Sequence, residues 1–559
     1  MKKAIKKVHE VRLLAVNDPH RVYGESRAKI RNPKRYCLVA FIKEIGGEVE
    51  VLMPMTHIED LRSLKTFLIN NGHPPVDDPV YWKELRQRFY SGCKAELKLS
   101  LAPGFVEGVY LCGDGNVIGD RNRYVRLHPE ARFRPSTLSS NGSLQDWKMQ
   151  VALLALYSDR LMLALCTAFS GLIVEWAGIE SGGFHMHGTS SDGKTTATKF
   201  ACTVYGDDRY LLSWDVTEAG IEEAAVGMND ALLPLNELKL LNADPVIAAQ
   251  KGSKLVYLIA EGSGRYRASS YQENHSQWKT VVLSSGELSL AEHAASGLSK
   301  RFAGEAVRII DIPSDAGSGY GILDKIPERF SSASKFAEHI TEQCAQYYGT
   351  AFRPFVEGIL EWLESDAGSV QTKINAYVDE FFDKCDVDRN DRQEMRVARR
   401  FGVAFAAGAI AIDLGVLDFK HSEVGKAIRS CYRSYLRDKP KTARQRIDEA
   451  CSAAIDRVSK AELLDLTGSI QRYTLEDVER VHGFRTRCKG EVVYAMKPDW
   501  FQRSVGTQVK LAEVLAKLKS DHVLIPGSDG KSTRQVKTGF DDMPRMRCYC
   551  FRADTMSSL

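Results

Sequence analysis

The sequence predicts an α/β fold in which a parallel sheet lies between helices, with a β-rich region before it and a helical region after it. Three observations support this class. A short apolar run at 182–187 leads through a glycine-rich loop into a helical pattern at 196–204. Apolar runs typical of strands then alternate with helical segments up to residue 313, as expected for a parallel sheet. From 331 to 437, apolar residues recur with helical spacing almost without interruption.

The length of 559 residues indicates several domains, because single cores rarely grow beyond about 250–300 residues. The polar, turn-rich stretch at 134–143 marks one boundary. The predicted domains are a basic N-terminal arm at 1–35, a β-rich N-terminal domain at 36–135, a P-loop core at 136–330, a helical lid at 331–440 and a winged-helix-like C-terminal domain at 441–559.

Composition and charge exclude several other classes. The net charge of +4 is too small to indicate a nucleic-acid partner by itself. The twelve cysteines lack zinc-ligand spacing, so we expect reduced thiols in a cytoplasmic protein. The N-terminal residues lack the apolar stretch of a secretory signal. The longest apolar runs, 161–174 and 403–417, are expected to be buried helices, and no membrane partner is expected.

The most specific motif is G-x-x-x-x-G-K-[ST], which runs from Gly188 to Thr195. A glycine-rich turn at the start of a helix points backbone N–H groups inward, where phosphates can bind. Lys194 would reach the β- and γ-phosphates, and the Thr195 hydroxyl would hold Mg²⁺. A glycine turn without a ligand is the alternative. The predicted nucleotide-binding residues are Gly188, Thr189, Ser190, Ser191, Asp192, Gly193, Lys194, Thr195 and Thr196.

The apolar run at 231–235 leads to Asn236 and Glu237, where a P-loop ATPase needs acids for Mg²⁺ and for the attacking water. Asn236 can accept a hydrogen bond from a metal-bound water but brings no charge. Pro234 is unusual in a central strand because it has no N–H. Glu237 remains available to activate the water. The site is therefore either altered but functional, or degenerate and weakly hydrolysing.

Four further residues are candidates for contact with the γ-phosphate. Ser284 and Ser285 end another apolar strand and could sense this group. Arg301 precedes the last predicted strand, where an arginine finger for a neighbouring subunit would lie. Arg396 starts an apolar helix, on the same face as two other arginines. A charged helix surface is the ordinary interpretation of Arg396, and a phosphate contact from a lid is the other.

Two segments could contact DNA. Arg265, Tyr266 and Arg267 lie in a glycine-bearing excursion that could touch a phosphate backbone and stack on bases, or form a solvated turn. The segment at 507–551 resembles a helix followed by a basic two-stranded wing, which would bind a duplex or pack on the core. The basic arm could also neutralise phosphates, although a solvated tail is the commoner interpretation.

Together these motifs resemble the bacterial P-loop family catalogued as domain of unknown function nine-two-seven, which is found on phages, plasmids and other mobile elements. The resemblance covers about residue 40 to the end of the chain. Besides the P-loop, it is carried by Gly182-Gly-Phe-His, Asn229-Asp-Ala-Leu-Leu, Gly264-Arg-Tyr-Arg-Ala-Ser, Leu283-Ser-Ser-Gly-Glu287, Arg308-Ile-Ile-Asp-Ile-Pro and Arg396-Val-Ala-x-Arg-Phe.

That family includes replication helicases of staphylococcal cassette elements, which are similar to the MCM group of AAA+ helicases. The resemblance implies an AAA+ core, hexameric rings around DNA, and sites for ATP and Mg²⁺ shared between neighbours. Family members usually carry Asp where this chain has Asn236, a departure that bears on the rate of hydrolysis and not on binding. By position the resemblance implies a hydrolytic role for Glu237, sensor roles for Ser284 or Ser285 and for Arg396, a trans finger in Arg301, and a DNA-gripping hairpin at Arg265 and Arg267.

We therefore expect an ATP-dependent DNA helicase or translocase of a mobile genetic element, acting on single-stranded or forked DNA as a homo-oligomer, expected to be a hexamer. The alternative is a slowly hydrolysing, ATP-switched DNA-binding assembly or phage-defence protein, and Asn236 favours it. A metabolic kinase is a third possibility, which the lid, the finger residues and the winged-helix end disfavour.

Overall fold

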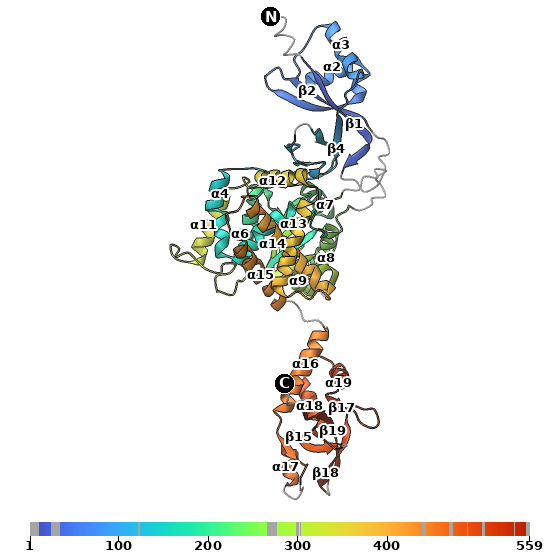
Figure 1. The fold of residues 1–559 in the computed structure, drawn as a ribbon, viewed down its shortest axis with the longest axis vertical. Helices are drawn as coiled ribbons and strands as arrows, with labels where there is room; N and C mark the ends of the chain where they lie inside the picture. The colour runs from blue at the N-terminus through green and yellow to red at the C-terminus, as the bar shows by residue number, and fades with distance from the viewer. Residues whose placement is uncertain are drawn as a thin grey trace. The chain divides into compact units, whose positions relative to one another are not determined.

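The computed structural model describes residues 10–23, 34–120, 123–264, 277–297, 301, 303–438, 443–468, 473–488, 490–505, 509–540 and 543–554. The chain forms two compact units, Met1–Asp438 and Lys439–Leu559, and the boundary between them falls close to the predicted one at residue 440. Figure 1 shows the elements of each unit.

The first sheet lies in the region predicted to be β-rich, and it also includes residues 12–23 of the predicted basic arm. Residues 12–23 form a strand in the middle of this sheet, antiparallel to one neighbour and parallel to the other. Ala15 on this strand is completely buried. Burial of apolar side chains therefore stabilises this strand in the sheet, although the charges that flank it suggested a solvated tail. The strand order β3-β2-β1-β4-β8 joins β1 (Arg12–Tyr23), β2 (Tyr36–Ile42), β3 (Glu48–Pro54), β4 (Glu96–Ser100) and β8 (Val125–Leu127).

Two helices cover this sheet, α2 (Leu61–Asn70) and α3 (Pro79–Tyr90). Aspartates at their N-caps, Asp60 and Asp78, accept hydrogen bonds from the first free backbone N–H groups. Trp82 of α3 packs into the same apolar cluster as the sheet. A separate three-stranded sheet follows, made of β5 (Gly104–Val106), β6 (Val109–Leu111) and β7 (Val117–Gly119).

The central sheet is parallel throughout, as predicted, and the carboxyl ends of its strands therefore meet at one edge. β9 and β12 approach so closely that a Cβ atom at Gly183 would lie 1.9 Å from the carbonyl oxygen of Val282, which requires glycine there. The order is β10 (Leu212–Ser213), β11 (Ala231–Asn236), β12 (Thr280–Gly286), β9 (Gly182–His187) and β13 (Ile309–Pro313).

Pro234 lies within β11, although proline was unexpected in a central strand. The neighbouring strand β10 is only two residues long and pairs with Leu235 and Asn236. One flank of β11 is therefore open beside Pro234, which is the kind of place where proline is tolerated in a sheet.

Helices pack on the central sheet from segments before and after it. α5 and α6 contact β11 and β12, while α8 contacts β9, α7 and α9. α5 is buried nearly all round, as its uninterrupted apolar run predicted. These helices are α4 (Leu144–Gln150), α5 (Asp159–Gly171), α6 (Lys194–Cys202), α7 (Glu218–Gly227), α8 (Pro245–Glu261), α9 (Leu290–Ser296) and the short α10 (Ala303–Ala306).

The region predicted as a lid is helical, and its helices share one apolar core with the central sheet. α14 packs on α5, and the rings of Phe401 and Phe184 lie 4.8 Å apart. This region is therefore an additional layer of the core. In the described part of the chain, no helix is long and apolar enough to span a bilayer. The helices are α11 (Ala333–Gln346), α12 (Phe352–Ser365), α13 (Ser369–Cys385), α14 (Arg392–Asp413) and α15 (His421–Asp438).

The second unit contains a larger sheet than the two-stranded wing predicted for it. Six strands run in the order β14-β15-β16-β19-β17, with β18 paired to β19. Alternate residues of β19 enter two different apolar clusters, because Tyr549 and Phe551 face one side and Cys548 and Cys550 the other. Apolar side chains therefore cover both faces of β19, whereas a free two-stranded wing would leave one of its faces uncovered.

Helices and strands alternate along this second unit. The strands are β14 (Leu463–Asp465), β15 (Gly483–Cys488), β16 (Glu491–Met496), β17 (Leu524–Ile525), β18 (Arg534–Phe540) and β19 (Met543–Arg552). The helices are α16 (Ala443–Ser459), α17 (Leu475–Arg480), α18 (Pro498–Val505) and α19 (Leu511–Ser520).

Candidate nucleotide-binding site

The glycine loop has the local structure that its sequence predicts, with β9 before it and α6 directly after it. Gly193 has φ of +88°, and a Cβ atom there would lie 2.9 Å from the side chain of Ile322. A Cβ atom at Gly188 would lie 2.1 Å from Ser314 Oγ. Both positions therefore require glycine, for backbone conformation and for close packing.

Lys194 opens α6, and its ammonium group folds against the loop. Its Nζ donates to the carbonyl oxygens of Gly188 at 3.0 Å and Thr189 at 2.5 Å. The residue is only 6% exposed. In the described part of the chain it has no carboxylate within ion-pair distance. A buried cation without a counter-ion favours an anionic ligand beside it.

Three oxygen-bearing side chains meet at the carboxyl edge of the sheet, beside the loop. Asn236 Oδ1 accepts from Ser285 Oγ at 2.6 Å and from Thr195 Oγ1 at 3.3 Å. The parallel pairing of β11 with β12 brings the ends of these strands together. Glu237 follows, and its backbone N–H lies 3.4 Å from Ser285 Oγ. The structure thus brings together four of the residues proposed from sequence.

Glu237 adopts a backbone conformation that is uncommon for a residue with a side chain, with φ of +60°. It begins the 3-10 helix Leu238–Leu241. Non-glycine residues with positive φ cost about 1–3 kcal/mol each and persist where the surroundings hold them. Glu237 lines the same pocket as the glycine loop, so the unusual backbone turns a carboxylate toward the site.

The two serines at the end of β12 have different surroundings. Ser284 is fully buried, and its Oγ accepts from Trp214 Nε1 at 2.8 Å. It also bonds His185 Nδ1 at 2.8 Å, while His185 Nε2 bonds the Leu288 carbonyl at 3.0 Å. Burial lowers the pKa of His185 to about 4, so the neutral ring donates to Leu288 and accepts from Ser284. Both serines are buried, but Ser284 bonds core side chains, whereas Ser285 Oγ donates to Asn236 beside the glycine loop.

A pocket of about 630 Å³ lies beside these groups, and Lys194, Thr195 and Glu237 are part of its lining. Sequence reasoning missed two parts of its wall. One is Glu287, just beyond β12, which forms an ion pair with Lys239 at 3.5 Å. The other is the segment 319–323 after β13, where Ile322 donates its N–H to Asp192 O at 2.9 Å. Glu287 had a usable signal, because it follows a strand end at the same edge as Glu237.

Two arginines predicted to contact the γ-phosphate lie elsewhere in this chain. Arg301 is buried and forms an ion pair with Asp311 of β13. Arg396 forms an ion pair with Glu180, which precedes β9. The P-loop follows the other end of β9, and six strand residues span about 20 Å. Arg396 is therefore far from the loop of its own chain, and Arg301 is already paired within its own subunit.

The predicted DNA-contacting residues Arg265, Tyr266 and Arg267 lie outside the described residues. All twelve cysteines are free thiols, as expected. Within the described ranges, no group of three or more His, Cys, Asp or Glu side chains could hold a metal ion by itself. The hydroxyl and amide oxygens of Thr195, Asn236 and Ser285 nevertheless fit Mg²⁺ that is also bound by phosphate oxygens and water.

Comparison with solved structures agrees with this architecture. A structure titled "SCCmec type IV Cch - active helicase" resembles the chain with a TM-score of 0.54 and 17% identity, covering 98% of this chain and 94% of that one. A second, titled "The A form apo structure of NrS-1 C terminal region-CTR", has a TM-score of 0.23 and 8% identity, covering 68% of this chain and 85% of that one. The first match shows a similar fold.

No curated protein matches the chain in sequence. A family model does match it, over residues 9–278, and its description is "Domain of unknown function (DUF927)". This is the family that the P-loop and its surrounding motifs resembled. The family model covers a little less than half of the chain, and over this part the chain is similar to the DUF927 family.

Proposed function

We propose that this protein is an ATP-dependent DNA helicase or translocase of a mobile genetic element. The observation that carries the proposal is the pocket at the carboxyl edge of the sheet. There a buried, unneutralised Lys194 lies beside the oxygens of Thr195, Asn236 and Ser285 and the carboxylate of Glu237. A cation, a hydroxyl and an acid are groups that P-loop ATPases use for hydrolysis, and here the amide of Asn236 takes the place of a second acid.

In this proposal each side chain has one task. Lys194 binds the β- and γ-phosphates of ATP, and the backbone N–H groups of the loop surround them. Thr195 and Asn236 would hold Mg²⁺, which supplies positive charge against the phosphates. Glu237 orients the attacking water and accepts its proton. Ser285 holds Asn236 in place and lies within reach of the γ-phosphate.

The proposed DNA partner and the proposed oligomer are supported by a different observation, the fold comparison. The fold is similar to that of a solved helicase, which favours single-stranded or forked DNA as the partner and a homo-oligomeric, hexameric ring. Arg265, Tyr266 and Arg267 are the proposed hairpin contacts. For a site shared between subunits, Arg301 would have to exchange Asp311 for the γ-phosphate of the neighbour. Arg396 would likewise have to leave Glu180.

The test uses the purified full chain. ATP turnover is measured with and without single-stranded DNA, and strand separation is measured on a fluorescent forked duplex. The proposal expects turnover that DNA stimulates and strand separation that requires ATP. Turnover no higher than that of a Lys194→Ala variant, with no strand separation, would refute it.

Asn236 also favours a second function, a slowly hydrolysing ATP-switched DNA-binding assembly or phage-defence protein. The variant Asn236→Asp separates the two. An aspartate can accept the same hydrogen bonds from Ser285 and Thr195, so a site adapted to asparagine should change turnover by less than about threefold, or ~0.7 kcal/mol. Steady-state phosphate release measures this. A rise of a hundredfold or more would favour the switch.

The paired variants Ser285→Ala and Ser284→Ala should act differently. We expect Ser285→Ala to lower ATP turnover about tenfold, because Asn236 loses its shorter hydrogen bond, with little change in stability. Ser284→Ala leaves Trp214 Nε1 and His185 Nδ1 unpaired in the core, which should cost about 1–3 kcal/mol of unfolding free energy. Turnover and denaturant unfolding of both variants check this. Equal effects on turnover would contradict the role of Ser285 in positioning Asn236.

A further inference from the structure

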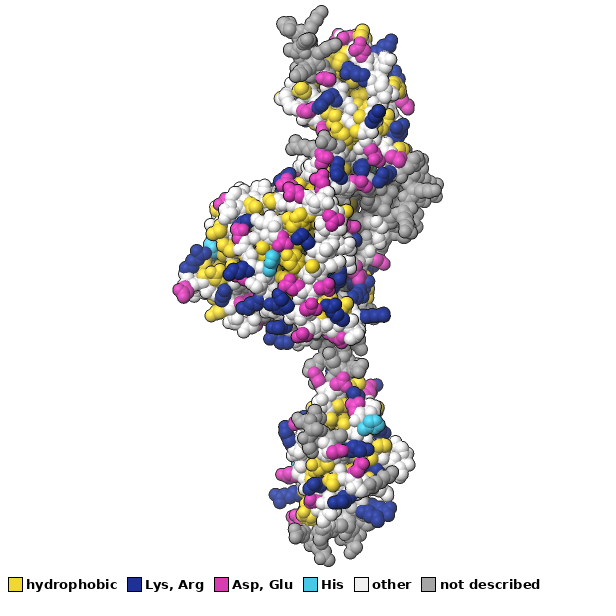
Figure 2. Space-filling view, viewed as in Figure 1, with side chains coloured by type: hydrophobic (Ala, Val, Ile, Leu, Met, Phe, Trp, Pro, Cys, Tyr) yellow, Lys and Arg dark blue, Asp and Glu magenta, His cyan; other side chains and the backbone are white. Residues whose placement is uncertain are grey.

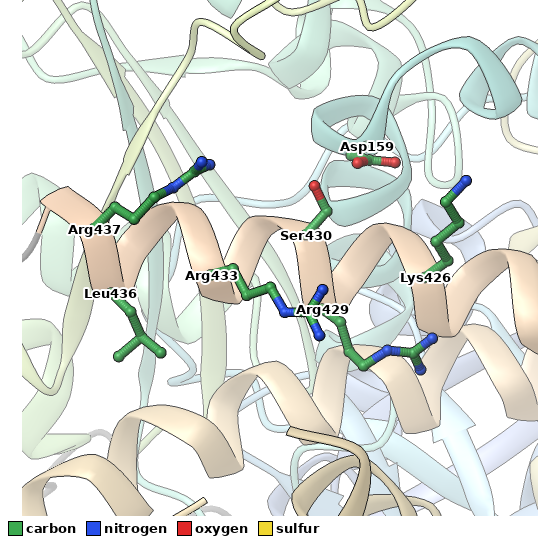
Figure 3. A pocket seen from close by; sticks show the side chains of 7 residues that line it. All are labelled: Asp159, Lys426, Arg429, Ser430, Arg433, Leu436 and Arg437. Carbon is green, nitrogen blue, oxygen red and sulfur yellow. The ribbon is translucent and has the colours of Figure 1, made fainter. Parts of the chain in front are cut away.

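Helix α15 carries four cations on its exposed side. Lys426, Arg429, Arg433 and Arg437 follow one another at three- or four-residue intervals, so they form a continuous row, which we call the α15 basic stripe. Lys426, Arg433 and Arg437 are exposed and Arg429 is half-buried. In Figure 2, Lys and Arg side chains gather where Figure 1 draws α15. The close view in Figure 3 shows the row from end to end.

These cations differ from three cations on exposed helices and from Arg389 in the turn after α13. Arg353, Lys373, Lys384 and Arg389 each have a carboxylate partner, in two cases one helical turn away. In the described part of the chain, the four cations of the stripe have none within 4.0 Å. Like charges four residues apart cost a helix about 0.2–0.5 kcal/mol per pair. The stripe therefore carries a repulsion that an anionic partner would relieve.

The stripe borders a hollow of about 700 Å³. Its other lining residues are Asp159, Ser430 and Leu436. Asp159 is the single acid among them, and burial raises its pKa. Figure 3 shows Ser430 facing Asp159 between the ends of the stripe. The surface is thus hollowed and positive, with one acid among four cations.

From Lys426 to Arg437, the stripe covers about 16 Å at 1.5 Å per helical residue. That length corresponds to about five phosphates at the 3.4 Å spacing of one strand in a duplex, and to fewer in an extended single strand. A row of cations at regular spacing, without carboxylate partners among the described residues, matches a phosphate backbone better than a folded protein surface, which presents mixed charges.

We propose that the α15 basic stripe binds the phosphate backbone of single-stranded nucleic acid without reading its sequence. The inference rests on the proposed function, to which it adds a binding surface outside the excursion at 265–267. Each cation that neutralises a phosphate releases a counterion, so binding through the stripe must weaken as salt rises.

The experiment compares two full-length variants that lose the same four charges. The stripe variant carries Lys426→Gln, Arg429→Gln, Arg433→Gln and Arg437→Gln. The control carries Arg353→Gln, Lys373→Gln, Lys384→Gln and Arg389→Gln. A fluorescent oligothymidine is the probe, and anisotropy gives Kd over a range of salt concentrations. Thermal unfolding checks that both variants are folded.

For the stripe variant we expect Kd to rise at least about tenfold. The slope of log Kd against log salt should fall by about 3, at roughly 0.7 per lost phosphate contact on a single strand. The control should stay within about twofold of wild type. A stripe variant with the affinity and salt slope of wild type would overturn the inference. A stripe variant that differed from wild type only in oligomeric state would also overturn it, and would indicate an acidic protein partner.

The result separates this inference from the proposed function. If the stripe variant kept normal DNA-independent ATP turnover and unchanged DNA affinity, the stripe inference would fail and the proposed ATP-dependent function would stand. If wild type had no ATP turnover and only the stripe variant lost DNA affinity, the proposed ATP-dependent function would fail and the stripe inference would stand.

Discussion

Lys194→Ala is expected to reduce ATP turnover by about 10²–10³-fold, the usual cost of removing one group that stabilises charge in a transition state. The ammonium group lies against the loop carbonyls of Gly188 and Thr189 and has no carboxylate to neutralise it within the described residues. Its charge is therefore available to the β- and γ-phosphates. Alanine would leave only backbone N–H groups to face the triphosphate, so nucleotide affinity should fall as well.

Lys199→Ala is the matched control, because Lys199 lies on the same helix and forms an ion pair with Asp208 on the surface. It should keep turnover within about twofold of wild type, since exposed ion pairs contribute only about 0–1 kcal/mol. Phosphate release and binding of a fluorescent ATP analogue measure both variants. If Lys194→Ala kept more than a tenth of wild-type turnover, the glycine loop would not be the hydrolytic site.

The second large effect concerns stability and pH. Asp230 precedes β11, and burial raises its pKa from 3.8 to about 7. Its Oδ2 accepts from the Phe105 N–H at 3.0 Å and from Asn229 Nδ2 at 3.1 Å, while Oδ1 has no partner. The folded state thus holds a proton between pH 4 and 7 that the unfolded chain has lost. This stabilisation is complete below pH 3.8 and is lost as pH rises through about 7.

The pKa shift corresponds to at most about 4 kcal/mol, at 1.36 kcal/mol per pKa unit. Asp230→Asn removes the titration and keeps a neutral group of similar shape. We therefore expect the unfolding free energy of wild type, relative to that of the variant, to fall between pH 5 and pH 8. Denaturant unfolding at both values measures it, and other titrating groups cancel in the difference. A difference independent of pH would show that Asp230 is charged in the folded protein.

Asp230 also illustrates a limit of sequence reasoning. Its motif was recognised, but its role as a contact between the small sheet at Phe105 and the central sheet depends on residues more than a hundred positions apart. The same holds for β1, whose parallel partner β4 lies far along the chain. Charges near residues 12–23 are visible in the sequence, whereas the pairing that buries Ala15 is not.

The P-loop could be predicted because its structure is local. Strand, glycine loop and helix lie within about twenty residues, and Gly188, Gly193 and Lys194 fulfil backbone and charge requirements that hold in any fold. Which of Ser284 and Ser285 lies near the γ-phosphate depends on the face of β12 to which each side chain points, and the sequence does not give that. Arg301 and Arg396 have the residue type that a phosphate contact needs, yet each has an acid in its own chain as partner.

The sequence by itself determined the parallel sheet, the glycine loop and the residue types at its edge, because periodicity and glycine conformation act over a few residues. The folded structure was needed to show that Thr195, Asn236, Ser285 and Glu237 converge, and that the cations of α15 have no acid within ion-pair distance among the described residues. Those relations arise where distant segments meet. Strand register and side-chain packing set them, and both depend on the whole folded core.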